Sequence, residues 1–510
     1  MDAKKVSTVY QVYPKSFQDS DGDGVGDLQG VISRLDYLSW LGVEMLWLNP
    51  VYVSPGYDNG YDVADYTRID PLFGSMDDMD ELIREARGRG IGIMMDIVAN
   101  HTSHQHEWFL QSERDPEGAF GNFYIWCDTP NEWSSFFGGG TWTYSPIRGQ
   151  YYFHAFAPEQ PDLNWGNEQV RKEMAAVLAF WVERGVTGFR FDVIDLIGKD
   201  VHRKQWLDFP LMRRYLKDLV AQVDTSSLLL VGEAGGLTPN EILTLQRDGS
   251  LDVVFNFEVC ALDEQAGQGK WKLAPFEPSR LKTTLDTWQR AFAVEGRNSL
   301  FWNNHDQPRV ISRWYDDDER AAKMLAVLLY GLKGIPFLYQ GEEVGMTNGM
   351  IATEEYQDIE TLNYLRAGGT LDAVRMKGRD HARIPMAWGE GTDSFSTGTP
   401  WLRSAHDEAG RDVATMRSDE TSLLNLYREL IALRRTNRLL RDGAYELVPT
   451  EERLYVYRRI IDGEPPLLVV ANLSQDTLPL PSGCGERLVS TEQVEAPMLR
   501  PYEAFICYNF

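Results

Sequence analysis

Acidic side chains follow three short apolar runs in this chain, at the points where the runs end. Asp192 closes the run GFRFD, Glu233 closes VGE, and Asp306 closes the sequence NNHD. Two carboxyl groups held in different protonation states can cleave a glycosidic bond, because one protonates the leaving oxygen while the other attacks or activates water. Arg190 lies two residues before Asp192 and thus on the same strand face, where its charge would keep that carboxylate ionised.

Eight apolar runs carry these residues, and segments with helical spacing separate the runs. We expect strands at 8–13, 43–48, 91–98, 188–193, 228–233, 252–257, 299–303 and 335–340. The runs are apolar on both faces, as buried parallel strands are. Residues 171–184 have helical apolar spacing, and Gly185 follows as a C-cap signal. The alternation predicts an α/β fold, a TIM (β/α)8 barrel rather than an open doubly wound sheet, with the active site at the C-terminal strand ends.

Two stretches depart from this alternation. Residues 102–170 are rich in Trp, Tyr, Gly and Pro, which predicts a loop-rich inserted domain after the third strand. From about Tyr445 the apolar pattern has period two, which predicts an antiparallel C-terminal β-sandwich domain over residues 437–510. The catalytic barrel would then comprise residues 1–101 and 171–436, with a loop-rich insertion at about 341–400.

The overall composition excludes several classes of partner. The 510 residues include 50 Lys and Arg against 76 Asp and Glu, a formal charge of −26. A polyanion without a basic cluster repels nucleic acids and anionic membranes, so we expect neither as a partner. No run of about 18 apolar residues and no apolar signal segment is present. With four scattered cysteines, these features predict a cytoplasmic protein without an organic cofactor.

Six motifs resemble, in order, the sequence regions of glycoside hydrolase family 13, the α-amylase superfamily. They are GVEMLWLNPVY (42–52), DIVANH (96–101), QPDLNW (160–165), GFRFDVIDLIGK (188–199), VGEA (231–234) and FWNNHDQPR (301–309). The resemblance runs from about Val9 to Arg435. It is strongest to the exo-acting branch that contains oligo-1,6-glucosidases, dextran glucosidases and trehalose-6-phosphate hydrolases. Membership would imply the barrel fold and a retaining double displacement.

The resemblance implies catalytic roles for the three carboxylates. Asp192 would be the nucleophile that forms a β-glucosyl-enzyme, and Glu233 would be the general acid and then the general base. Asp306 would bind sugar hydroxyls and favour the distorted, oxocarbenium-like ring. This division of labour requires Glu233 to be protonated at rest while Asp192 is ionised.

The resemblance also implies a clamp for the terminal glucose. Tyr61 and Asp62, in DNGYD, match a stacking tyrosine and a hydroxyl-binding aspartate. Arg383, in DHARIPMAW, matches an arginine that bridges to that aspartate. Such a clamp blocks one end of the pocket, so the enzyme would remove single glucose units from a non-reducing end. The remaining residues implied to contact the sugar are His101, Arg190, Val193 and His305.

An acidic loop follows the first expected strand. Asp19, Asp21, Asp23 and Asp27 place carboxylates at alternate positions, as calcium loops do. An EF-hand would need Glu where Gly30 stands, so an EF-hand is disfavoured. A similar loop in the resembling branch implies a structural Ca²⁺ or Mg²⁺ held by these four residues and the Val25 carbonyl. The alternative is a solvated acidic turn.

Val193 bears on the linkage that is cleaved. In the resembling enzymes, Val after the nucleophile accompanies α-1,6 cleavage, and Ala or Thr accompanies cleavage of α-1,4 bonds or sucrose. Ala234-Gly235-Gly236 after Glu233 and Ala387 in PMAW depart from the bulkier residues and the PMQW of relatives, which implies a differently shaped leaving-group site. We therefore expect a monomeric α-1,6-glucosidase acting on small oligosaccharides. The alternatives are an α-1,4-glucosidase or α-glucosyltransferase on maltose- or sucrose-type substrates, a trehalose-6-phosphate hydrolase, and a non-catalytic barrel.

Overall fold

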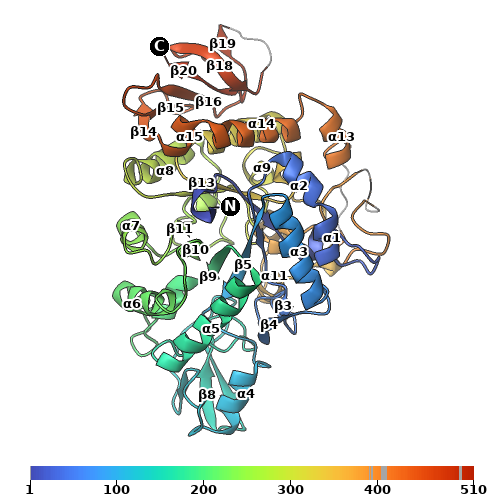
Figure 1. Cartoon of the computed structure of the whole chain (residues 1–510), viewed down its shortest axis with the longest axis vertical. Helices are drawn as coiled ribbons and strands as arrows, with labels where there is room; N and C mark the ends of the chain where they lie inside the picture. The colour runs from blue at the N-terminus through green and yellow to red at the C-terminus, as the bar shows by residue number, and fades with distance from the viewer. Residues whose placement is uncertain (1, 390, 392–393, 404–409, 493–496, 510) are drawn as a thin grey trace.

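A barrel of eight parallel strands forms the centre of the protein (Figure 1) in the computed structural model, which describes residues 2–389, 391, 394–403, 410–492 and 497–509. The strand order is β11-β10-β9-β5-β2-β1-β13-β12. The strands are β1 (Val9–Val12), β2 (Met45–Leu48), β5 (Gly92–Val98), β9 (Gly188–Asp192), β10 (Leu229–Glu233), β11 (Val253–Phe255), β12 (Ser299–Leu300) and β13 (Ile335–Tyr339). Each lies within its predicted range, so the predicted barrel fold is confirmed.

The barrel strands are buried on both faces, which explains their continuous apolar runs. In β2, Met45 and Trp47 belong to the cluster inside the barrel, whereas Leu46 and Leu48 pack with the surrounding helices. β11 and β12 do not pair through their backbones, and a side chain spans the gap instead. Ser299 Oγ in β12 donates to the carbonyl of Val254 in β11 over 2.9 Å, so the barrel is nearly closed.

Helices cover the outside of the barrel. They are α1 (Leu28–Ser33), α2 (Leu35–Leu41), α3 (Met76–Gly88), α5 (Glu168–Arg184), α6 (Phe209–Val220), α7 (Pro239–Arg247), α8 (Pro278–Ala291), α9 (Val310–Trp314), α10 (Glu319–Gly331), α14 (Leu423–Thr436) and α15 (Arg438–Asp442). The predicted helix before Gly185 corresponds to α5, which starts one turn earlier because Asn167 caps it, and Gly185 ends it with φ of 101°. None of the described helices combines the length and apolar character that crossing a bilayer requires.

Three segments lead out of the barrel, after β2, β5 and β13. Residues after β5 form α4 (Glu107–Arg114) and an antiparallel sheet of β6 (Trp126–Cys127), β8 (Gln150–Phe153) and β7 (Trp142–Ser145). A hairpin of β3 (Tyr52–Val53) and β4 (Asp65–Ile69) follows β2. The segment after β13 contains α11 (Ile359–Arg366) and α12 (Leu371–Lys377), and α13 (Val413–Ser418) precedes α14. Residues 390, 392 and 393 of the insertion predicted at 341–400 lie outside the described residues.

An antiparallel sheet forms the C-terminal region, at the opposite end of the molecule from β8 (Figure 1). Its order is β14 (Ala444–Val448), β15 (Leu454–Ile460), β16 (Leu467–Asn472), β20 (Ala504–Asn509) and β18 (Cys484–Ser490). One face packs with the barrel helices through residues such as Tyr457 and Val469. The other face, including Val456 and Val470, packs with the small pair β17 (Leu478–Pro479) and β19 (Met498–Leu499).

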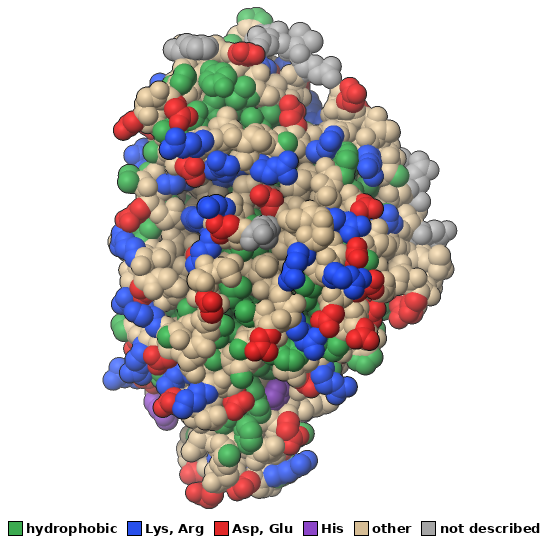
Figure 2. Space-filling model, in the orientation of Figure 1, with side chains coloured by type: hydrophobic (Ala, Val, Ile, Leu, Met, Phe, Trp, Pro, Cys, Tyr) green, Lys and Arg blue, Asp and Glu red, His purple; other side chains and the backbone are tan. Residues whose placement is uncertain are grey.

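The surface carries both signs of charge. Figure 2 shows Lys and Arg interspersed with Asp and Glu over one face of the molecule. Many of these charges form ion pairs with exposed side chains, as Arg84 does with Glu81. Such pairs contribute little to stability individually.

Candidate active site

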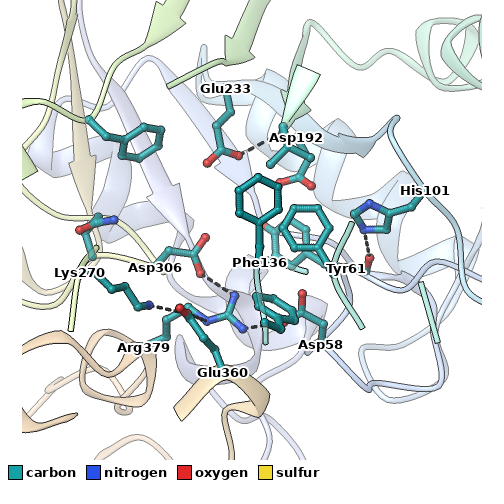
Figure 3. Close-up of a pocket in the computed structure, with 15 residues that line it drawn as sticks. Asp58, Tyr61, His101, Phe136, Asp192, Glu233, Lys270, Asp306, Glu360 and Arg379 are labelled. Atoms are coloured by element: carbon teal, nitrogen blue, oxygen red, sulfur yellow. Dashed lines mark hydrogen bonds and ion pairs between the residues drawn. The ribbon is translucent and has the colours of Figure 1, made fainter. Parts of the chain in front are cut away.

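Three of the predicted residues, all carboxylates, meet around one cavity at the C-terminal mouth of the barrel (Figure 3). Asp192 ends β9, Glu233 ends β10, and Asp306 lies in the loop after β12. The cavity has a volume of about 340 Å³. It is lined by Asp58, Tyr61, His101, Phe136, Phe137, Phe156, Asp192, Val193, Glu233, Phe257, Lys270, Asp306, Gln307, Glu360 and Arg379.

Arg190 joins two of these carboxylates from beneath the cavity. Its side chain is buried, and Nη1 donates to Asp96 Oδ1 over 2.8 Å and to Asp192 Oδ1 over 2.7 Å. Its Nη2 donates to Glu233 Oε2. A guanidinium offers donors in a rigid planar fork. Arg190 therefore fixes the separation and orientation of Asp192 and Glu233, although it does not itself line the cavity.

Asp192 and Glu233 share one cationic partner, Arg190, which also pairs with Asp96. Burial raises the pKa of Asp192 well above its ordinary value, the negative charges of Glu233 and Asp96 add to this, and Arg190 opposes it. Contrary to the expectation that Arg190 keeps Asp192 ionised, burial and the neighbouring carboxylates therefore favour the protonated form of Asp192. One protonated and one ionised carboxyl is the state that an acid and nucleophile need.

Asp306 has the opposite electrostatic setting. Its Oδ2 lies 3.1 Å from His305 Nε2, and its Oδ1 accepts from Arg383 Nη2 over 2.7 Å and from Arg379 Nη1 over 3.3 Å. Burial alone would raise the pKa of Asp306, but His305 and the two arginines outweigh it, and the pKa lies well below the ordinary range. Asp306 is therefore anionic at any working pH.

Tyr61 and His101 form one wall of the cavity. Tyr61 is stacked on His305, with ring centroids 5.1 Å apart and an interplanar angle of 8°, so His305 lies behind Tyr61. Tyr61 Oη donates to Asp96 Oδ2 over 2.9 Å, which fixes the ring. Burial lowers the pKa of His101 to about 4, so this imidazole is neutral above that pH.

The predicted bridge between Asp62 and Arg383 is not formed. The Asp62 carboxylate lies behind the cavity and accepts hydrogen bonds from the backbone N–H groups of Tyr57 and Asp58, each over 3.0 Å. Arg383 pairs with Asp306 and with Asp358. Asp62 thus stabilises a turn through its bonds to backbone N–H groups. Arg383 supports Asp306 through its ion pair with that carboxylate.

Asp58 and Arg379 form an ion pair that lines the cavity. Arg379 Nη2 donates to Asp58 Oδ1 over 2.8 Å and also pairs with Asp358 over 2.7 Å. Burial raises the pKa of Asp58 to about 6, against the opposing charges of Arg379 and Arg383. The motifs DNGYD and GRDHAR each contain two candidates of the same type, and the sequence does not show which of the two faces the cavity.

Several other lining residues escaped the sequence analysis. Lys270 and Glu360 form an ion pair at the mouth of the cavity (Figure 3). Phe257 follows β11, and Gln307 follows Asp306. Further aromatic rings, Phe136, Phe137 and Phe156, come from the insertion after β5. Apart from Glu360 in α11, these residues lie outside the helices and strands. The aromatic content of residues 102–170 was a signal for the three Phe residues alone.

Val193 has an unusual backbone conformation beside the carboxylates. Its φ of 36° and ψ of 45° place a β-branched residue in the left-handed region, which costs free energy and occurs mainly at functional sites. In this conformation its N–H donates to Glu233 Oε2 over 3.3 Å, while its side chain lines the cavity. The turn therefore orients Glu233 and presents the Val193 side chain together.

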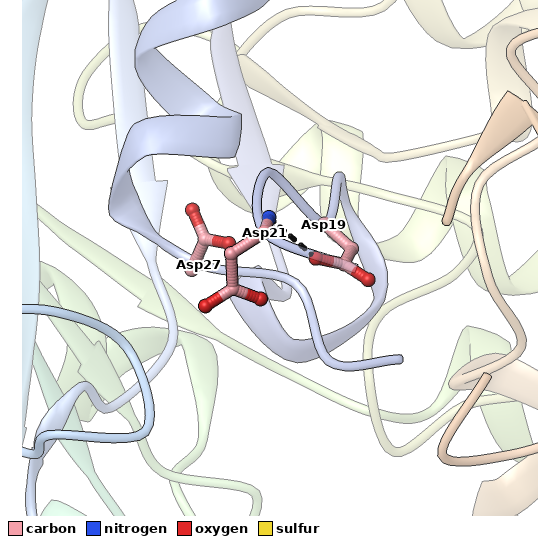
Figure 4. A group of neighbouring side chains, drawn as sticks. All are labelled: Asp19, Asp21 and Asp27. Carbon is pink, nitrogen blue, oxygen red and sulfur yellow. Dashed lines mark hydrogen bonds between the residues drawn. The ribbon is translucent and has the colours of Figure 1, made fainter. Parts of the chain in front are cut away.

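The acidic loop brings three of its predicted ligands together (Figure 4). One carboxylate oxygen from each of Asp19, Asp21 and Asp27 lies within 4.8 Å of the others. Asp23 falls outside this group, and its Oδ1 accepts from the backbone N–H of Val25 over 2.7 Å. Three converging carboxylates suit a hard cation such as Ca²⁺ or Mg²⁺, so these three residues fit the predicted metal.

Comparisons with known proteins agree with the barrel fold. Residues 11–443 match the model of the α-amylase catalytic domain. The chain therefore belongs to the α-amylase family of glycoside hydrolases, and it is of the α-glucosidase type.

Similar proteins cover nearly the whole chain. It is 43% identical to a glucan 1,6-α-glucosidase of Streptococcus pneumoniae serotype 4, over 98% of each chain. It is 41% identical to an oligo-1,6-glucosidase of Heyndrickxia coagulans, over 99% of each. The crystal structure of trehalose-6-phosphate hydrolase from Bacillus licheniformis superposes with a TM-score of 0.92 at 36% identity, over 99% of each chain.

Proposed function

We propose that the protein is a retaining, exo-acting α-glucosidase that hydrolyses the α-1,6 bonds of isomalto-oligosaccharides from the non-reducing end. The observation that carries this proposal is the cavity in which Asp192, Glu233 and Asp306 surround a space bordered by the Asp58–Arg379 pair. A charged wall at one side leaves room for a terminal glucose but not for a chain that continues through it. The enzyme therefore releases glucose units singly.

The proposed reaction has two displacements. Asp192 attacks the anomeric carbon while Glu233 gives its proton to the leaving oxygen, which forms a glucosyl-enzyme. Glu233 then takes a proton from water, and the resulting nucleophile releases glucose and regenerates Asp192. Asp306, anionic beside Arg383 and Arg379, binds hydroxyls of the glucose and favours the positive charge that develops on the ring.

The arrangement around Arg190 supports retention of configuration. An inverting enzyme needs carboxyl groups about 6.5–9.5 Å apart to admit a water between them, whereas a retaining enzyme needs about 5–5.5 Å. Asp192 and Glu233 accept from adjacent nitrogens of a single guanidinium. Held this closely, they favour direct attack by Asp192 over activation of an intervening water.

Two observations favour an α-1,6-linked neutral substrate. Val193 lines the cavity next to Asp192 and Glu233, and two similar proteins are named for 1,6-glucosidase activity. The cations of the cavity wall are already neutralised, because Lys270 pairs with Glu360 and Arg379 pairs with Asp58. A phosphorylated sugar would need a cation free to pair with the phosphate, so hydrolysis of trehalose 6-phosphate is the weaker candidate.

The acidic loop is proposed to hold a structural Ca²⁺, with Mg²⁺ as the alternative. Asp19, Asp21 and Asp27 would supply carboxylate oxygens. The bound ion would neutralise their mutual repulsion and hold the loop between β1 and α1. It would take no part in the reaction, because the catalytic carboxylates lie at the cavity and the loop does not line it.

Product analysis tests this proposal. We expect ¹H NMR of isomaltotriose during digestion to show glucose and isomaltose as the first products, with the new glucose in the α configuration. Newly formed β-glucose would contradict retention, and release of products other than single glucose units would contradict exo action. Trehalose 6-phosphate as the better substrate in the same assay would favour the alternative.

A further inference from the structure

An aromatic surface continues from the cavity wall toward the outside. Phe136 lines the cavity and is 49% exposed. Its ring packs against Trp206, with centroids 4.5 Å apart and an interplanar angle of 37°. Trp206 in turn packs against Trp133 at 3.8 Å and 34°. We call these three residues the aromatic shelf.

The shelf is held in place from both sides. A two-way backbone bridge between Asp200 and Gln205 forms a tight turn immediately before Trp206, in the segment between β9 and α6. Trp206 and Val193 both pack against the cluster that includes Leu196. The same apolar cluster therefore supports the residue next to Asp192 and the ring farther out.

Two glycines follow Ala234 between the cavity and the shelf. Gly235 and Gly236 have no side chains there. A Cβ atom on Gly235 would lie 3.2 Å from the ring of Phe257, and one on Gly236 would lie 3.3 Å from Leu207, the neighbour of Trp206. Phe257 and Leu207 therefore pack closely over this backbone, and a larger residue at either position would push them aside.

We propose that the aromatic shelf binds a glucose unit beyond the one directly next to the cleaved bond. This inference rests on the proposed function and specifies its substrate: isomalto-oligosaccharides of three or more units are preferred over isomaltose. The flat apolar face of a pyranose ring packs well on indole and phenyl faces, which bury a large area with few rotatable bonds. Neutral sugar is the fitting occupant, because the shelf is continuous with the sugar cavity and is built of uncharged rings.

Chain-length kinetics on variants test the shelf. For Trp206→Ala we expect kcat/KM on isomaltotetraose to fall about tenfold, equivalent to about 1.4 kcal/mol of lost contact. The value on isomaltose should change by less than about twofold, because isomaltose does not reach the shelf. The matched control is Tyr144→Ala, which removes an exposed ring of the insertion that carries Trp133 and Phe136. Tyr144 packs against Tyr151 and does not line the cavity.

Two more variants distinguish loss of the sugar contact from a folding defect. Trp206→Leu removes the flat ring but keeps apolar volume and should show the same selective loss, whereas Trp206→Phe should retain most of the preference. An equal loss on both substrates, or no loss on either, would overturn the proposal. If the wild type prefers maltose to isomaltose, the linkage assignment fails, and the maltose and maltotetraose pair then tests the shelf in the same way.

Discussion

Arg379 donates from Nη2 to Oδ1 of Asp58 over 2.8 Å, across 321 residues of sequence. The two residues come from the loop after β3 and from the segment after α12, and both line the cavity. Charges buried to this extent persist only when they are paired. The pair therefore links two separate loops and sets one boundary of the sugar site.

Removal of this pair should damage catalysis. We expect Asp58→Ala to lower kcat/KM on isomaltose by about 100-fold or more, since it removes a hydroxyl-binding group and leaves Arg379 without one of its partners. Steady-state kinetics measures this loss. The matched control is Asp65→Asn on β4. Its carboxylate accepts from Thr67 and does not line the cavity, so its replacement should leave kcat/KM unchanged. Wild-type activity in Asp58→Ala would show that the pair is not part of the site.

The two catalytic carboxylates should be distinguishable by chemical rescue. With 4-nitrophenyl α-glucoside, both Asp192→Ala and Glu233→Ala should be impaired, Asp192→Ala by about 10⁴-fold or more. Azide attacks without needing a general base. It should yield the β-glucosyl azide with Asp192→Ala, by direct displacement, and the α-glucosyl azide with Glu233→Ala, by attack on the glucosyl-enzyme. The reverse pattern would exchange the two roles.

The Val193 side chain should influence linkage preference. It lines the cavity beside Glu233, where the leaving sugar departs. We expect Val193→Ala to lower the ratio of kcat/KM for isomaltose over maltose by about tenfold, because a smaller side chain admits other poses of the leaving sugar. An equal change on both substrates would mean that Val193 acts only through the backbone of its turn.

Removal of a bound cation should lower stability without affecting chemistry. We expect EGTA to lower Tm and added Ca²⁺ to restore it, since a ligand at about 100 times its Kd stabilises the folded state by about 2.7 kcal/mol. The Asp21→Asn variant should lose this response, and Asp23→Asn should keep it, because Asp23 lies outside the carboxylate group. A Tm insensitive to both chelator and Ca²⁺ would identify the loop as a solvated turn.

Glu342 should make stability depend on pH. Burial raises its pKa from 4.5 to about 7, although Tyr427 and Asn303 donate hydrogen bonds to the carboxylate. The folded state binds this proton more tightly than the unfolded chain, so the free energy of unfolding falls as pH rises from 4.5 to 7.

The corresponding variant should remove that dependence. The free energy of unfolding of Glu342→Gln, relative to that of the wild type, should rise by about 3 kcal/mol between pH 4 and pH 8. Urea denaturation across this range measures the difference, with exposed Glu420→Gln as the control. A constant difference between variant and wild type at all pH values would contradict the shifted pKa.

The barrel and its carboxylates were predictable because their signals are local. Each strand is a short continuous apolar run, and Asp192 and Glu233 end their strands, so the strand positions fixed where these residues lie. Arg190 is two residues from Asp192, and the period of a strand places both on one face.

The clamp was not predictable in the same way. DNGYD offers Asp58 and Asp62, and only the turn at residues 57–60 decides that Asp62 caps backbone N–H groups while Asp58 faces Arg379. Loop residues such as Phe136 follow no period, so their position depends on tertiary packing. In the acidic loop, alternate spacing suggested Asp23 as a ligand, but its carboxylate lies outside the group that Asp19, Asp21 and Asp27 form.

The ratio of kcat/KM for isomaltose to that for maltose tests the central claim most directly. It compares two disaccharides of the same composition that differ in the bond cleaved, so the ratio reports on the linkage specificity of the site. We predict that isomaltose exceeds maltose by about tenfold or more, with purified enzyme and both substrates below KM. A preference for maltose by the same factor would contradict the assignment as an α-1,6-glucosidase.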